Sequence, residues 1–89
     1  PDVVGFVDDT EMTFIESKIT ALNLANVGQL VGYCLIADPE YAYLISTKPV
    51  SAGLKKILTS YPELLSYNGK KIQIGFLDMT TGNVKLEKI

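Results

Sequence analysis

The densest group of side chains that could do chemistry is acidic. Asp8, Asp9 and Glu11 follow a short apolar run and precede residues with helical spacing. Carboxylates at such a position could hold a hard cation such as Mg²⁺ or Ca²⁺. The same acids would also stabilise a helix N-terminus, because they cap free N–H groups and interact favourably with the helix dipole. We favour capping and keep Asp8, Asp9 and Glu11 as candidate metal ligands.

Hydroxyl, small and basic residues gather where a second helix is predicted to begin. Ser51 and Gly53 lie there beside Lys55 and Lys56, and the first N–H groups of a helix can receive an anion. The spacing differs from that of nucleotide-binding phosphate loops, and Ser51 as a simple helix cap explains the same residues without a ligand. A small anionic ligand at Ser51, Gly53, Lys55 and Lys56 is therefore kept as a hypothesis.

The chain lacks two residue types that are common in functional sites. It has no histidine, which removes the commonest general base and metal ligand. It also has no arginine, which disfavours specific DNA or RNA binding. An enzyme that uses Asp8, Asp9 or the amine of Pro1 is the minor alternative. We therefore expect a non-enzymatic protein without a cofactor and without a specific nucleic-acid partner.

The positions of apolar residues predict five strands and two helices. Strands are predicted where β-branched and aromatic residues run together or alternate, at residues 3–7, 29–37, 41–47, 70–77 and 84–89. Helices are predicted at residues 8–26 and from Ser51 to the residue before Pro62, because apolar residues recur there at helical spacing. Left-handed turns are predicted at Asn68-Gly69 and at Gly82.

This order, β-α-β-β-α-β-β, predicts an α+β fold. It matches a ferredoxin-like (split βαβ) two-layer sandwich with an added C-terminal hairpin strand, although profilin-like or three-layer sheets can share the order. The length suits a single domain over residues 1–89. No apolar run could span a membrane, and Cys34 has no partner for an intrachain disulfide, so we expect a cytoplasmic protein with a buried thiol.

The predicted strand at residues 29–37 is apolar on both faces, and two helices could cover only one of them. An uncovered apolar face invites association with another chain. We therefore predict a homodimer, or a stable protein partner, whose interface buries Val31, Tyr33, Leu35, Tyr41 and Tyr43. The predicted function is that of a small assembly or adaptor module that acts through this interface.

The predicted element order also resembles that of ACT domains, which share βαββαβ and bind small-molecule effectors at a dimer interface. The resemblance implies a regulatory domain that binds an anion or metabolite. Such domains typically have glycine in the loop after the first strand, whereas this sequence has Asp8-Asp9-Thr10 there.

Overall fold

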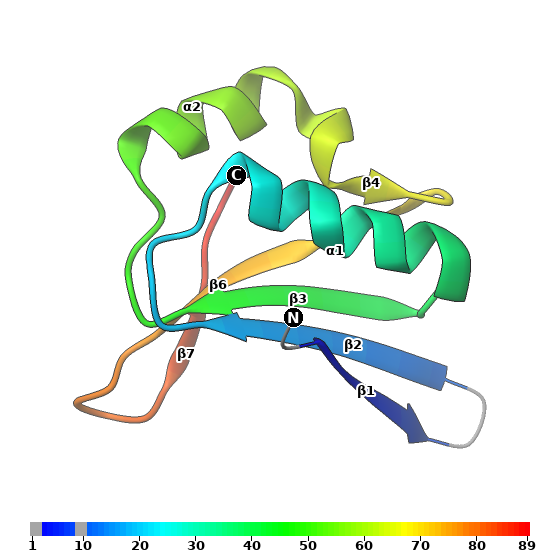
Figure 1. Ribbon diagram of the computed structural model, residues 1–89. Coiled ribbons are helices and arrows are strands. Elements are labelled where there is room, and N and C mark those ends of the chain that lie inside the picture. The colour runs from blue at the N-terminus through cyan, green and yellow to red at the C-terminus, as the bar shows by residue number, and fades with distance from the viewer. Residues whose placement is uncertain (1–2, 9–10) are drawn as a thin grey trace.

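The computed structural model describes residues 3–8 and 11–89, and within them two helices lie on one face of a five-stranded mixed sheet (Figure 1). The sheet has the order β1-β2-β3-β6-β7. Its strands are β1 (Val3–Asp8), β2 (Glu11–Lys18), β3 (Tyr41–Ser46), β6 (Gln73–Leu77) and β7 (Val84–Leu86). This arrangement confirms the predicted two-layer α+β class.

The helical layer is made of α1 (Leu24–Ala37) and α2 (Ala52–Ser60). A turn of 3₁₀-helix, Pro62–Leu65, follows α2 and leads into a small hairpin of β4 (Ser66–Tyr67) and β5 (Lys70–Lys71). The hairpin lies at one end of α1 (Figure 1). Among the residues described, no helix is long and apolar enough to cross a membrane.

The predicted order of elements is wrong in the first half of the chain. Residues 11–18 form strand β2, where a helix was predicted, and residues 29–37 belong to α1, where a strand was predicted. β2, β3 and β6 pair in parallel, whereas β1–β2 and β6–β7 pair antiparallel. The fold is therefore not the ferredoxin-like arrangement, and the element order behind the resemblance to ACT domains is absent from the described chain.

Local sequence explains where α1 begins and ends. The side chains of Asn23 and Asn26 each accept a hydrogen bond from the other's backbone N–H, both at 2.9 Å, which satisfies two free donors of the first turn. Asp38 ends the helix in the left-handed conformation (φ 51°), and Pro39 follows it. The helix was mistaken for a strand because its own apolar residues occur on every side of it. They do not form a single stripe with helical spacing.

The strand β2 was mistaken for a helix for a different reason. Alternate residues of a strand point to opposite faces, so Phe14 and Glu16 both point toward the helices. A carboxylate at an inward position interrupts the alternation of apolar and polar residues that would have identified the strand. The helical spacing of Ile19 and Leu22 was fortuitous, because both lie after the strand ends.

The core lies between the helices and the sheet. From α1 it receives Val27, Leu30 and Cys34, and from β3 it receives Ala42 and Leu44. Burial raises the pKa of the Cys34 thiol to about 11. The thiol is therefore protonated at neutral pH, in agreement with the predicted buried cysteine.

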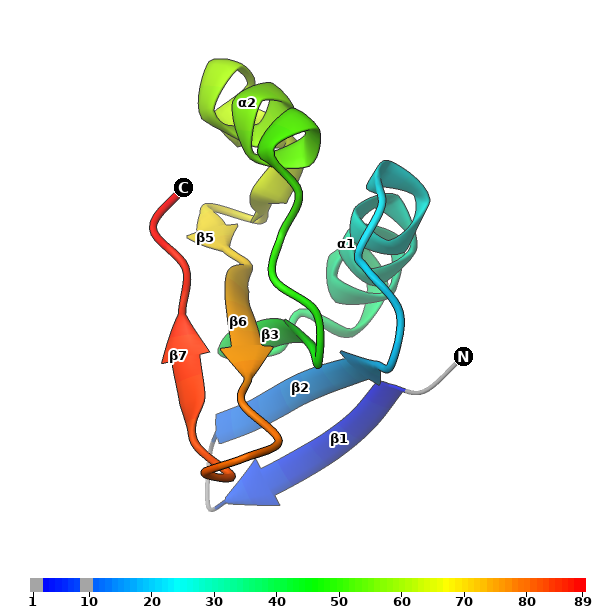
Figure 2. The same cartoon turned by 90° about the vertical axis from the view of Figure 1, so that its left-hand side faces the viewer.

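The opposite face of the sheet is open. Because Ala42 and Leu44 point toward the helices, Tyr41, Tyr43 and Ile45 point away from them. Tyr41 is exposed, and the other two are partly buried. Figure 2 shows that both helices lie on the same side of the sheet, so neither helix of the described chain covers this face.

Most predictions for the second half of the chain are confirmed. The predicted strand at residues 70–77 is divided, however, because Lys70–Lys71 pairs with β4 in the small hairpin and Gln73–Leu77 joins the main sheet, and the last strand ends at Leu86. Residues 41–46 and 73–77 are strands, and Ser51 caps α2 by accepting a hydrogen bond from the Leu54 N–H at 3.1 Å. Asn68 (φ 48°), Gly69 (φ 78°) and Gly82 (φ 75°) have the left-handed backbone that their turns require.

A polar cluster fastens the β4–β5 hairpin to the end of α1. The buried Tyr67 hydroxyl donates to the Pro39 carbonyl at 3.0 Å. One carboxylate oxygen of Asp38 accepts from the Lys70 ammonium at 3.0 Å and from the Asn68 amide at 3.1 Å. These hydrogen bonds, that of Lys70 above all, hold the pKa of Asp38 below its ordinary value of 3.8.

Two glycine substitutions test the corrected elements. A Cβ at Gly32, within α1, meets open space, so Gly32→Ala should stabilise the protein by about 0.5–1 kcal/mol through helix propensity. A Cβ at Gly75 would lie 3.0 Å from Val84 and 3.4 Å from Ile45, so Gly75→Ala should cost about 1–3 kcal/mol. Urea unfolding measures both, and a destabilising Gly32→Ala would contradict the helix.

Candidate functional site

The carboxylate of Glu16 lies in the core of the protein. Glu16 is on β2, paired with Leu44 of β3, and it is 0 % exposed. Within the described chain, neither of its carboxylate oxygens has a hydrogen-bond partner. The Lys18 ammonium lies 3.4 Å from one of them, as an ion pair without hydrogen-bond geometry, and the Lys18 side chain is 20 % exposed. Lys18 therefore connects a buried acid to the surface.

This arrangement is unfavourable for folding. Moving a carboxylate out of water costs several kcal/mol, and an ion pair offsets that cost only when hydrogen bonds satisfy the remaining lone pairs. Those bonds are missing for Glu16 in the described residues. Buried polar groups without partners are rare in folded proteins and call for an explanation. A ligand that contacts the carboxylate is one such explanation.

The ends of β2 and β3 are tied together beside this pair. The buried Ser46 hydroxyl donates to the Thr20 carbonyl at 2.6 Å and accepts from the Lys48 N–H at 3.0 Å. The Thr47 N–H donates to the Lys18 carbonyl at 3.1 Å. The backbone that carries Lys18 is thus fixed to the end of the neighbouring strand.

A cavity of about 230 Å³ opens at the same end of the sheet. Ile19, Ile45, Leu77 and Met79 give it apolar walls, and Lys18 is the charged residue among those that line it. The connections that leave β2, β3 and β6 all emerge here (Figure 1). Ligands of α/β proteins commonly bind at the carboxyl ends of parallel strands.

The predicted metal ligands do not lie at a helix start. Asp8, the last residue of β1, is paired with Glu11, the first residue of β2, and Glu11 is exposed. Asp9 and the side chain of Asp8 lie outside the described residues. In the part of the chain that is described, no three side chains of His, Cys, Asp or Glu form a group that could hold a metal ion. A cation at Asp8, Asp9 and Glu11 stays a prediction.

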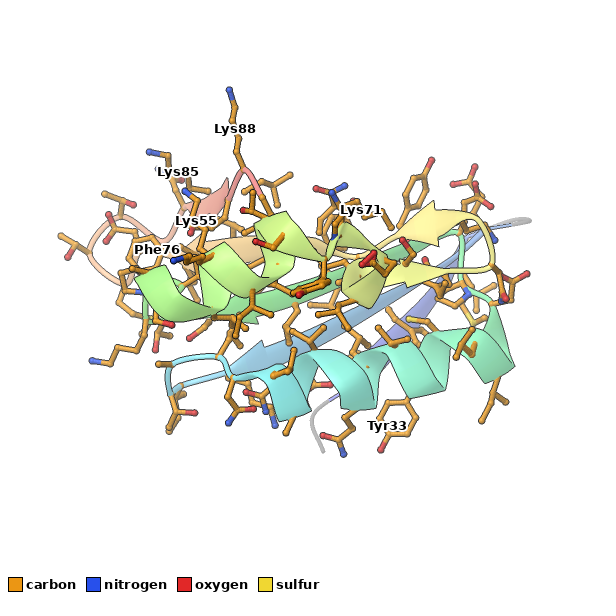
Figure 3. The ribbon with its side chains drawn as sticks, turned by 90° about the horizontal axis from the view of Figure 1, so that it is seen from above. Tyr33, Lys55, Lys71, Phe76, Lys85 and Lys88 are labelled. Atoms are coloured by element: carbon orange, nitrogen blue, oxygen red, sulfur yellow. The ribbon has the colours of Figure 1, made fainter. Side chains whose placement is uncertain are left out.

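The predicted anion-binding residues lie at the start of α2. Ser51 acts as the cap, and Gly53, Lys55 and Lys56 are exposed. Figure 3 shows Lys55 on the same side of the molecule as Lys71, Lys85 and Lys88, which come from other segments. A surface that carries several lysines attracts anions of many kinds. A specific anion site at Ser51, Gly53, Lys55 and Lys56 stays a prediction.

The predicted interface residues do not share one surface. Val31, Tyr33 and Leu35 lie on α1, and Tyr33 points outward from it (Figure 3). Tyr41 and Tyr43 lie on the open face of the sheet, opposite the helices. The predicted strand at residues 29–37 is helical, so Val31, Tyr33 and Leu35 do not lie beside Tyr41 and Tyr43 in one sheet. That another chain buries them stays a prediction.

Glu16 and Lys18 were not predicted as a pair from the sequence. Both were assigned to a helix, where residues two apart point in different directions. On a strand, residues two apart share a face. The signal that could have found them is an acid and a lysine on alternate positions among the apolar residues Phe14, Ile15 and Ile19.

Comparisons with protein-family models, with curated proteins and with solved structures gave no match to this chain.

Replacing the buried pair tests its energetic cost. In Glu16→Met/Lys18→Met, apolar groups of similar size remove the desolvation of both charges, so the free energy of unfolding should rise by about 1–4 kcal/mol. Urea unfolding followed by circular dichroism measures the change. In the control Asp38→Asn/Lys70→Met, which removes an exposed pair, stability should change by about 0–1 kcal/mol. A double variant at residues 16 and 18 that is clearly less stable would show that the pair serves the fold.

Proposed function

We propose that this chain binds a divalent cation through Glu16 and, together with Lys18, hydrolyses a phosphate ester. The observation that carries the proposal is the burial of the Glu16 carboxylate without a hydrogen-bond partner in the described chain, 3.4 Å from the Lys18 ammonium. The pair lies near the carboxyl end of β2, where the polypeptide opens to solvent through Lys18.

Glu16 suits a hard divalent cation. A carboxylate is the ligand that Mg²⁺ prefers in proteins, and this ion is commonly bound by one or two carboxylates together with water and the oxygens of the substrate. A cation would interact with the oxygens that lack hydrogen bonds and so offset part of their desolvation. When bound, such a cation supplies an activated water and neutralises negative charge.

Lys18 suits the anionic part of a substrate. Its ammonium is a compact charge that binds phosphate oxygens well, and it stands beside the proposed cation ligand. In the reaction, the oxygen of a water bonds to phosphorus and that water releases a proton to solvent, the bond from phosphorus to the alcohol oxygen breaks, and the departing alkoxide takes up a proton from solvent. Lys18 would hold a phosphoryl oxygen and stabilise the negative charge that develops on it.

Two further features support a phosphate substrate. The hydrogen bonds of Ser46 and Thr47 fix the backbone at Lys18, and a fixed charge stabilises a transition state better than a mobile one. The side that carries Lys55, Lys71 and Lys88 (Figure 3) would attract anions from solution.

Cation binding and hydrolysis test the proposal together. Glu16→Gln should weaken the binding of Mn²⁺, measured by calorimetry, about tenfold or more. Lys18→Met should keep most of the cation affinity but slow the hydrolysis of bis-para-nitrophenyl phosphate about 100-fold. Glu63→Gln, which removes an exposed acid from the turn of 3₁₀-helix after α2, is the control and should change neither quantity.

Asp2→Asn belongs in the same series. Asp2 lies outside the described residues and directly precedes Val3, which pairs with Glu16. A fall in Mn²⁺ affinity would identify it as a second ligand. If the unmodified chain neither binds Mn²⁺ nor cleaves the ester, the buried ion pair is purely structural and the proposed function is wrong.

An assembly function is the second candidate, and the open face of the sheet supports it. Tyr41, Val84 and Leu86 expose apolar surface on this side, which neither helix of the described chain covers. A second copy that packs the same face against it would remove that surface from water. The proposed occupant is therefore another molecule of this chain.

Sedimentation velocity at micromolar concentration tests this second candidate. We expect a dimer that Tyr41→Lys converts to a monomer, because a lysine on the packed face would leave a buried charge without a partner. Ile36→Lys, on the exposed surface of α1, is the control and should leave the dimer intact. A monomeric unmodified chain would exclude self-assembly through this face.

A further inference from the structure

The two edge strands of the main sheet differ in how well they are protected from pairing with another chain. β7, at one edge, is three residues long and has Lys85 at its centre. A short length and a lysine are two devices by which proteins keep an edge strand from acquiring a new neighbour. β1, at the other edge, has six residues and contains neither lysine nor proline. The edge at β1 therefore lacks the protection that β7 has.

β1 is also regular along its whole length. Six consecutive residue pairs join it to β2, from Val3 with Glu16 to Asp8 with Glu11, and no bulge interrupts them. A bulge would twist the edge away from an approaching strand. Within the described chain, β1 has a neighbouring strand on one side only. The outward-directed N–H and C=O groups of this strand are thus arranged to pair with a further strand.

Apolar side chains are exposed on both faces of β1. Val4 is paired with Ile15, which points away from the helices, so Val4 lies on the open face of the sheet, where it is 52 % exposed. Val7, three positions later, points to the opposite face and is 76 % exposed. The helices therefore do not cover Val7, and Figure 2 shows β1 at the margin of the sheet. A strand added beside β1 would shield part of both side chains from water.

The charges of β1 favour its own copy as that strand. No charged residue occurs from Val3 to Val7, so a charged peptide would find no opposite charge along this stretch. Two copies of β1 can pair antiparallel about a two-fold axis, the commonest symmetry of protein assemblies. When the pair is centred on Phe6, Gly5 lies opposite Val7 and Val4 lies opposite Asp8. No two acids of β1 then face each other, as like charges on paired strands would destabilise the ladder.

We propose that β1 pairs antiparallel with β1 of a second copy of this chain, so that two five-stranded sheets become one continuous sheet. The two-fold axis is then perpendicular to the sheet, and the helices of both copies lie on the same side. The Glu16–Lys18 pairs of the two copies also lie on that side, each separated from the axis by β1. The inference does not depend on the proposed function, because it uses only the free edge of β1.

This pairing is weaker than the association proposed for the open face. Two six-residue edges bury less surface than the 1,200 Å² or more that is typical of stable interfaces, so we expect a dissociation constant of about 0.1–1 mM. Edge pairing is therefore hardly populated at micromolar concentration. The variant Tyr41→Lys, which removes association through the open face, provides a background in which edge pairing can be observed alone.

Concentration series of Tyr41→Lys test the pairing directly. Sedimentation equilibrium from about 10 µM to 1 mM should show a monomer turning into a dimer. Nuclear magnetic resonance over the same range should show amide shifts in β1. A mixture of labelled and unlabelled copies should give contacts between copies near Gly5 and Val7. A chain that stays monomeric at the highest concentration, or shifts that leave β1 unchanged, would overturn the inference.

Lysine substitutions in the same background locate the contact. Val7→Lys supplies the protection that β1 lacks and should weaken the dimer about tenfold or more. Val4→Lys, on the other face of the strand, should have the same effect. Ile36→Lys adds the same charge at a position on α1 that is 88 % exposed, so it is the control and should leave the dissociation constant unchanged. Circular dichroism checks that each variant is folded. A dimer that survives both β1 substitutions, or that Ile36→Lys weakens equally, contradicts pairing through β1.

Discussion

Parallel pairing of β2 with β3 and of β3 with β6 brings three strand ends to one end of the sheet. Lys18 ends β2, Ser46 ends β3 and Leu77 ends β6. Parallel neighbours need crossover connections, and α1 and α2 provide them on the same face of the sheet. The helices that make this pairing feasible also remove Glu16 from water. The buried acid, the lysine beside it and the apolar cavity are thus consequences of one pairing pattern.

The rest of the molecule compensates for the buried carboxylate. A protein of this size is stable by about 5–15 kcal/mol, so a buried ion pair whose carboxylate lacks hydrogen bonds takes up a large share of that stability. Leu44, which is paired with Glu16, belongs to the apolar core, and Ser46 ties the strand ends with two hydrogen bonds. Proteins often keep such locally unfavourable groups where activity needs them. The buried carboxylate of Glu16, which lacks hydrogen bonds in the described chain, is also the centre of the candidate site.

The sequence predicted most elements of the second half of the fold, apart from the β4–β5 hairpin, and failed in the first half. The turns at Gly69 and Gly82 and the helix cap at Ser51 depend only on residues close by in the chain. They could therefore be predicted from the local sequence. β2 could not be predicted, because the inward position of Glu16 is decided by residues far away in the chain. The α+β class was predicted from an element order that is wrong in the first half, and it holds because the chain still combines two helices with a sheet. The strand order depends on which segments meet. The acidic and hydroxyl-rich segments were noticed because their members are adjacent, and the cavity was missed because three separate connections form it.

The parallel ladder also affects the order in which the protein can fold. The β1–β2 hairpin joins neighbouring segments, but β2 gains its other partner only after α1 and β3 have been made, and β3 waits in the same way for β6. Pairings between distant segments are slow to form, because the intervening chain must first be ordered. The burial of Glu16 depends on the β2–β3 ladder, so we expect its dehydration to come late in folding. A change at this position would then act mainly on the rate at which the native protein opens, and hardly on the rate at which it forms.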